Sequence, residues 1–264
     1  MKKILCALVI ACACLLHSCT NKPVAVNTAV LKMLTADSLS GTWMPEEYLM
    51  AVEHGKSVWG ARDVTFSFFV FWLSKQNLLS DSAAINGATE HEGGYTADLK
   101  FDSASGRFIN DLSKPVTYRY IDEPFEMRLI SSNLLEIYFI NSNSRELYRK
   151  VNNVDEELNR LLLAGVYTDL KTQESVTLNA DGSILSTWTE NHYALLYDFM
   201  EGIEFDALQL YYDKEQSSEF LNTLYHFKFS SDTLFLYPAV DQLGDFNYTI
   251  GAPVKTLIRQ KPLS

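Results

Sequence analysis

The chain contains no cysteine after residue 19. Its four cysteines are Cys6, Cys12, Cys14 and Cys19. Everything downstream therefore has no thiol for a disulfide, a nucleophile, or a zinc or iron–sulfur site. The folded part must be stabilised by a hydrophobic core, and an apolar content of 47% over 264 residues is sufficient for one or two cores.

The usual catalytic and cofactor motifs are also missing. The sequence has no Gly-x-Ser-x-Gly nucleophile elbow, no P-loop and no dinucleotide-binding glycine motif. Its five histidines never form a His-x-His or His-x-x-x-His pair, and His91-Glu92-Gly93 lacks the second histidine of the helical zinc-protease motif. We therefore expect a protein that is not an enzyme and that uses no metal or cofactor.

Positive charge is scarce. The chain has 22 basic and 33 acidic residues, a formal net charge of −11. Because such a chain repels phosphate backbones, we expect no nucleic-acid partner.

The N-terminus carries an export signal. Met1-Lys2-Lys3 precedes an apolar run from Ile4 to Leu16, which is too short to span a membrane. Leu16, Ser18 and Cys19 then resemble the lipobox of bacterial lipoproteins, although His17 is unusual there; an ordinary secretory signal is the alternative.

The lipobox resemblance implies cleavage after residue 18 and acylation of Cys19, which would anchor the chain to a membrane through lipid. Loss of Lys2 and Lys3 would change the net charge to −13, from 20 basic and 33 acidic residues. Thr20 is not the aspartate of inner-membrane lipoproteins, and Thr20-Asn21-Lys22 lacks an acidic surface-display run. We therefore expect an outer-membrane lipoprotein on the periplasmic face.

After the anchor, the sequence predicts a tether and then a mostly β body. Residues 19–38 show no clear period, and Pro23 disfavours a helix start, so we expect an unstructured tether. Two helices are predicted: one from Pro45 to the Gly55 stop, and one from Asn153, which forms a capping-box pair with Glu156, to Leu163. The other patterned stretches predict strands, at 64–73, 95–101, 107–109, 116–121, 125–130, 134–140, 146–151, 166–170, 175–178, 184–188, 193–200, 207–212, 221–229, 233–237 and 254–258. Asp181-Gly182 gives the clearest hairpin signal.

The two β regions resemble each other. Gly41-Thr-Trp43 matches Gly165-Val-Tyr167 at an offset of 124 residues, and Ser131–Tyr138 matches Ser230–Tyr237 at an offset of 99. The fall in offset predicts about 24 extra residues early in the first copy, where the Pro45 helix lies.

Each copy opens with Gly-x-aromatic and closes with an arginine, which resembles the lipocalin and wider calycin barrels. The resemblance implies that Arg149 covers Trp43 beside Gly41, and that Arg259 covers Tyr167 beside Gly165, closing one end of each barrel. Tyr167 departs from the tryptophan of that pattern. Gly-x-Trp-x-Pro-x-Glu-Tyr-Leu from Gly41 and the His91 turn also resemble lipocalin-like outer-membrane lipoproteins of Bacteroidetes type, a group that implies a fold and a location but no reaction.

We therefore predict a mainly β protein with a lipocalin-like half at 39–152, a linking helix at 153–164 and a second half at 165–264; one larger merged barrel is the alternative. The leading function is binding of a small apolar molecule or glycan in a barrel cavity. The alternative is a structural subunit with a solid core that contacts another envelope protein. The candidate ligand-binding residues are Trp72, His91, Glu92, Trp188 and His192.

Overall fold

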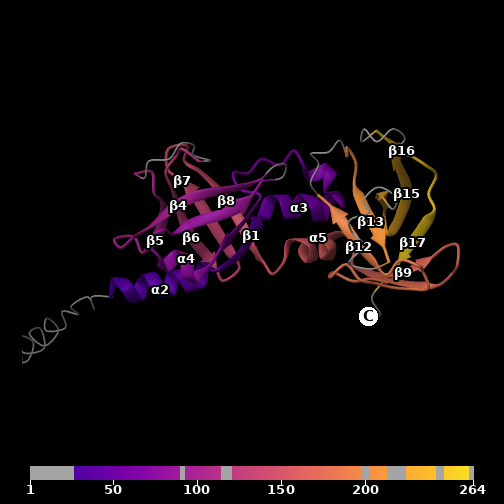
Figure 1. Cartoon of the computed structure of the whole chain (residues 1–264), viewed down its shortest axis with the longest axis horizontal. Helices are drawn as coiled ribbons and strands as arrows, with labels where there is room; N and C mark the ends of the chain where they lie inside the picture. The colour runs from indigo at the N-terminus through magenta and orange to yellow at the C-terminus, as the bar shows by residue number, and fades with distance from the viewer. Residues whose placement is uncertain are drawn as a thin grey trace, which may run out of the picture.

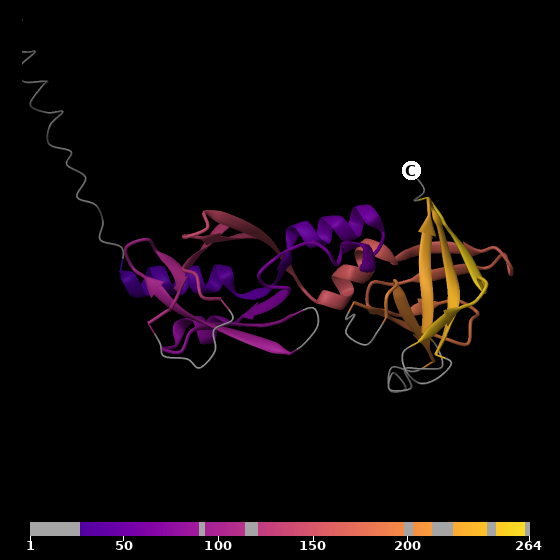
Figure 2. The same cartoon turned by 90° about the horizontal axis from the view of Figure 1, so that it is seen from above.

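A computed structural model shows two antiparallel β-barrels in tandem. It describes residues 27–89, 93–113, 121–197, 203–212, 224–241 and 247–261. The barrels lie at opposite ends of an elongated molecule, with two helices, α3 and α5, between them (Figures 1 and 2). The prediction of two barrels is confirmed, and the alternative of one merged barrel is wrong.

The first barrel is closed, because each of its eight strands pairs with the next and β8 pairs back with β1. Its strands are β1 (Gly41–Pro45), β2 (Val70–Leu73), β3 (Ala84–Ala88), β4 (Gly94–Asp102), β5 (Arg107–Asn110), β6 (Phe125–Ser131), β7 (Leu134–Phe139) and β8 (Ser144–Val151).

The second barrel repeats this order with eight strands and one addition. The sheet runs β11-β10-β9-β17-β15-β14-β13-β12, and a bridge between Ser183 and His192 joins its two edges. Its strands are β9 (Gly165–Asp169), β10 (Ser175–Leu178), β11 (Ile184–Leu185), β12 (His192–Leu196), β13 (Ala207–Tyr211), β14 (Leu224–Ser230), β15 (Thr233–Asp241) and β17 (Lys255–Arg259), with β16 (Tyr248–Ile250) added beside β15.

Each barrel is preceded by a helix. Before the first lies α2 (Thr28–Leu39), whose N-terminus is capped by the Asn27 side chain. Before the second lies α5 (Val154–Leu162), capped by Asn153 as predicted. The expected tether at 19–38 is therefore wrong over residues 28–38: the capping asparagine starts a helix four residues after Pro23, and α2 belongs to the first repeat.

The β1–β2 connection is much longer than its counterpart. It spans residues 46–69 and contains α3 (Glu46–Gly55) and a short 3₁₀ helix (Trp59–Ala61), whereas β9 and β10 are joined by residues 170–174 alone. This insertion lies where the change in offset placed it. The strand predicted at 64–73 is shorter than expected and begins at Val70, because residues 66–69 fold inward, where Phe68 and Phe69 are buried.

A few further differences are local. The helix α4 (Lys75–Leu79) and the strands β3 and β16 were not predicted. The strand predicted at 116–121 lies almost entirely outside the described residues. No helix in the described ranges has both the length and the apolarity that crossing a membrane requires.

The two cores differ in composition. The first barrel is filled mainly by aromatic rings, whereas leucine, isoleucine and valine dominate the second. The second core is continuous with the apolar faces of α3 and α5, so the insertion of the first barrel packs against the second. Lys56, just after α3, also donates to the Leu161 carbonyl at 3.0 Å, and Ser57 donates to Asp206 at 2.6 Å.

Candidate functional site

The two barrels are closed at one end by the same contact. In the first, the indole nitrogen of Trp43 donates to the Leu39 carbonyl at the end of α2, at 2.9 Å. In the second, the Tyr167 hydroxyl donates to the Leu163 carbonyl at the end of α5, at 2.7 Å. Both aromatic side chains are fully buried. Each helix therefore seals one end of the barrel that follows it.

A cation covers each of these aromatic rings. The Arg259 guanidinium lies 5.2 Å from the Tyr167 ring centre and donates to the Tyr167 hydroxyl and the Leu162 carbonyl, both at 2.6 Å. In the first barrel Lys150 occupies this place, 5.4 Å from the Trp43 ring and 3.4 Å from the Ser38 carbonyl. The bare Cα of Gly41 makes room for it, because a Cβ there would lie 2.3 Å from the Lys150 side chain.

The expected cover of Trp43 by Arg149 is therefore wrong by one residue. Trp43 lies directly opposite Lys150 in the β1–β8 pair, and Tyr167 lies opposite Arg259 in the β9–β17 pair. Because successive side chains point to opposite faces of a strand, Arg149 faces outward. There it binds both carboxylate oxygens of Glu46 at 2.6 Å and lies 3.5 Å from Glu157, tying β8 to α3 and α5.

The end of each barrel opposite the closed end is called the open end. In the first barrel, side chains fill this open end. Glu146 lies on the inner face of β8 and accepts hydrogen bonds from the Ser67 backbone and hydroxyl and from the Tyr148 hydroxyl, at 2.5 to 3.1 Å. Phe68 packs against Tyr148 and Phe71. The insertion thus carries Ser67 and Phe68 into this end and supplies hydrogen-bond donors to Glu146, whereas Phe66 and Phe69 pack with Tyr48 in the core shared with the second barrel.

The open end of the second barrel is built differently. Lys255 lies opposite the buried Leu236 in the β15–β17 pair, so its side chain is on the inner face. Its ammonium lies 3.6 Å from the centre of the Trp188 ring, which comes from the loop after β11. Within the described part of the chain this ammonium makes no hydrogen bond or ion pair. Tyr225, opposite the buried Leu208, shares the same inner face.

The electrostatics of this end follow from partial burial. Desolvation lowers the pKa of Lys255, while the nearby carboxylates of Glu190 and Asp169 oppose that shift. Burial and Glu190 together raise the pKa of the Tyr225 hydroxyl. The site therefore combines two aromatic groups with a half-buried cation that forms no direct ion pair among the described residues, which suits an anionic group attached to a flat or apolar body.

Lys255 and Glu146 occupy the same place in the two copies. Glu146 lies opposite Ile137 and Lys255 opposite Leu236, and those two partners differ by the offset of 99 found in the sequence. The inward alternation of Lys255 with Leu257 and Arg259 is the sequence signal that could have revealed it, since a lysine among inward-facing residues is unusual.

The structure separates the candidate ligand-binding residues. Trp188 lies at the open end just described. Trp72 does not point into the barrel: it is 45% exposed on the outer face of β2, between the buried Phe71 and Leu73. His192 also faces outward, stacked on Tyr211 and hydrogen-bonded to Asn191. His91, Glu92 and Cys19 lie outside the described residues.

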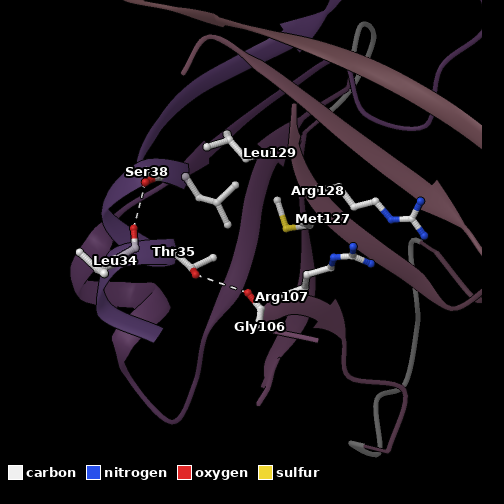
Figure 3. A pocket seen from close by; sticks show the side chains of 9 residues that line it. Leu34, Thr35, Ser38, Gly106, Arg107, Met127, Arg128 and Leu129 are labelled. Atoms are coloured by element: carbon white, nitrogen blue, oxygen red, sulfur yellow. Dashed lines mark hydrogen bonds between the residues drawn. The ribbon is translucent and has the colours of Figure 1, made fainter. Parts of the chain in front are cut away.

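A separate pocket lies between α2 and the first barrel. It has a volume of 310 Å³ and is formed where α2 crosses β5 and β6 (Figure 3). The pocket is lined by Leu34, Thr35 and Ser38 of α2 and by Met127 and Leu129 of β6, and Arg107 and Arg128 extend away from α2 (Figure 3). The described residues contain no cluster of three or more histidine, cysteine or acidic side chains that could hold a metal ion.

Together, the fold and its ends define a tandem antiparallel β-barrel protein whose barrels share one closed-end design and differ at the open end. Comparison with family models, curated proteins and solved structures found no match to this chain.

Proposed function

We propose that the chain is a lipid-anchored, non-catalytic protein of the cell envelope that binds a small molecule or glycan at the open end of its second barrel. The Lys255 ammonium over Trp188, which makes no hydrogen bond or ion pair among the described residues, carries the proposal. Glu190 and Asp169 act on this partly desolvated cation without a direct ion pair, so a ligand that supplies an anionic group would satisfy it.

The ligand would be small, with an apolar or ring face against Trp188 and an acidic group near Lys255. Tyr225 and Glu190 would supply further polar contacts at the rim. Such a site, apolar with a few polar groups, is typical of small-molecule recognition. The anchor is Cys19, and the resemblance to lipocalin-like envelope lipoproteins supports the location.

The alternative function is a structural subunit that binds another envelope protein through its outer surface. The filled interior of the first barrel favours this for that half of the chain, since Phe68, Phe71, Phe108, Phe125 and Tyr148 are all fully buried there. We therefore assign ligand binding to the second barrel and a supporting role to the first.

Binding of an anionic aromatic probe, 8-anilinonaphthalene-1-sulfonate, tests the proposal. We expect saturable binding that Lys255→Met and Trp188→Ala each weaken about tenfold, a loss of about 1.4 kcal/mol. Trp72→Ala is the matched control, because it removes a tryptophan from the outer face of the first barrel. Equal affinity in all four proteins would contradict the proposed site. Native mass spectrometry of protein from its host would then separate a retained small molecule from a stoichiometric protein partner.

A further inference from the structure

An exposed apolar surface lies at the end of the molecule where the N-terminal segment enters. On α2, Val30 and Met33 are each 44% exposed and Leu34 is 55% exposed. At the end of β6, Leu129 is 39% and Ile130 is 55% exposed. Leu34 and Leu129 form two sides of the pocket beside α2 (Figure 3). We call these five residues the α2 face.

Packing of α2 on the first barrel does not require the α2 face. The helix buries Ala36 and Leu39, and the Leu39 carbonyl accepts the Trp43 hydrogen bond. Val30, Met33 and Leu34 are spaced three and four residues apart and remain exposed, so they form a second apolar stripe beside that contact. Contiguous exposed apolar surface of this kind marks an interaction site.

The chain that leads into α2 favours a lipid surface as the occupant. Eight Cα–Cα steps, through residues 20–26, separate the proposed acylated Cys19 from the Asn27 cap. Even fully extended they span at most about 29 Å, which is close to the thickness of the bilayer's hydrocarbon core. An anchored Cys19 therefore keeps the α2 face near the membrane.

The charges beside the α2 face suit phospholipid headgroups. Arg107 and Arg128 both bind Glu126, while Arg128 and Arg145 share Glu136. The pocket beside the α2 face is lined by two basic side chains, Arg107 and Arg128, and by no acidic one, although the whole chain is acidic. Phosphate groups would be attracted to this edge, and the apolar side chains would enter the headgroup boundary.

We propose that the α2 face rests on the membrane in which the Cys19 lipid is inserted, holding the first barrel against the bilayer. This inference depends on the proposed lipid anchor. Apart from Cys19 the mature chain contains no cysteine, so a single introduced thiol can be labelled specifically.

The test uses full-length acylated protein in vesicles of phosphatidylethanolamine and phosphatidylglycerol that contain a spin-labelled lipid. A fluorophore is placed on Met33→Cys, and the matched control is Leu185→Cys, which is 64% exposed on the outer face of the second barrel. We expect at least about twofold stronger quenching at position 33 than at position 185, because only the α2 face would reach acyl-chain depth. Circular dichroism checks that both labelled proteins are folded.

Sedimentation of the vesicles tests the Cys19 lipid anchor separately from membrane docking of the α2 face. If the wild-type protein pellets with vesicles and the Cys19→Ser variant does not, the lipid anchor is supported. Equal quenching at positions 33 and 185 would in that case overturn docking of the α2 face and leave the anchor in place. Concentration-dependent self-quenching at position 33 would show that a second copy covers the α2 face, and would also overturn docking. A Cys19→Ser protein that still pellets, without any acyl group on the wild type, would overturn the anchor and the orientation inferred from it.

Discussion

At the same inward-facing position, the first barrel has Glu146 and the second has Lys255. Three donors from Ser67 and Tyr148 hold the Glu146 carboxylate, and the two from Ser67 are present because residues 46–69 are long enough to fold back into that end. The β9–β10 connection of five residues, 170–174, is much shorter, and Lys255 lies over the Trp188 ring without a hydrogen bond or ion pair to any described residue. The closed ends, in contrast, are built alike. The fold thus specifies the closed end, whereas the connecting segments decide whether the open end is filled.

The outer faces of matching strands differ as well. On β6 and β7 of the first barrel, Glu126, Arg128 and Glu136 form ion pairs, and Arg128 stacks on Tyr138. On β14 and β15 of the second barrel, ring contacts link His226, Tyr237 and Phe235. A charged network keeps one sheet surface solvated, while the other presents half-buried rings. The two barrels therefore differ at the outer face as well as at the open end.

The largest expected loss of stability concerns the closed end, which the two barrels build alike. Trp43→Ala should lower the free energy of unfolding by about 3–5 kcal/mol, because it removes a fully buried aromatic ring. Tyr167→Ala should have a similar effect, since Tyr167 plays the same part under α5. Urea denaturation followed by far-UV circular dichroism measures both. A large loss in only one of the two variants would show that the two closed ends are not equivalent.

The open ends should respond unequally. Glu146→Ala leaves the buried Tyr148 hydroxyl and the Ser67 donors without their acceptor, and should cost about 2–3 kcal/mol of stability. Lys255→Ala removes a cation that no hydrogen bond or ion pair in the described residues compensates, and should change stability by less than about 0.5 kcal/mol. The same urea titration compares them, and a greater loss for Lys255→Ala would reverse the contrast drawn here.

Local signals in the sequence were enough for much of the fold. Asn153 and Gly55 marked helix ends, and Asp181-Gly182 marked the β10–β11 turn, because capping and positive-φ turns depend on a few adjacent residues. The internal repeat could also be recognised from the sequence, since Gly41 and Gly165 begin equivalent strands. The helix α2 was missed because its apolar residues lie on two faces, which hides the period of an amphipathic helix.

Pairing register could not be read from residue type. The comparison of the two copies aligned Arg149 with Arg259 because both are arginines. Strand pairing instead places Lys150 opposite Trp43. A shift of one residue moves a side chain from the inner face of a strand to the outer face. Trp72 was misplaced for a similar reason: both faces of β2 carry large apolar side chains, so alternation does not show which face is inside. The contact of Trp188 with Lys255 joins a loop to a strand 67 residues away, and only the closed topology brings them together.

The smallest expected effect is the pH dependence of the second barrel's stability. Burial holds the pKa of Lys255 below its ordinary value of 10.5, so the unfolded chain binds this proton more tightly than the folded chain. Stability should therefore rise with pH between the lowered pKa and 10.5, the opposite of a lysine held in an ion pair. Lys255→Met should lack this increase, so its small advantage at neutral pH should shrink as the pH is raised toward about 10. Urea titrations at increasing pH measure the difference, with Lys228→Met, exposed on the outer face of β14, as the control. If the Lys255→Met difference were independent of pH, Lys255 would be solvated like a surface lysine, and the reason for assigning an anionic ligand to it would be lost.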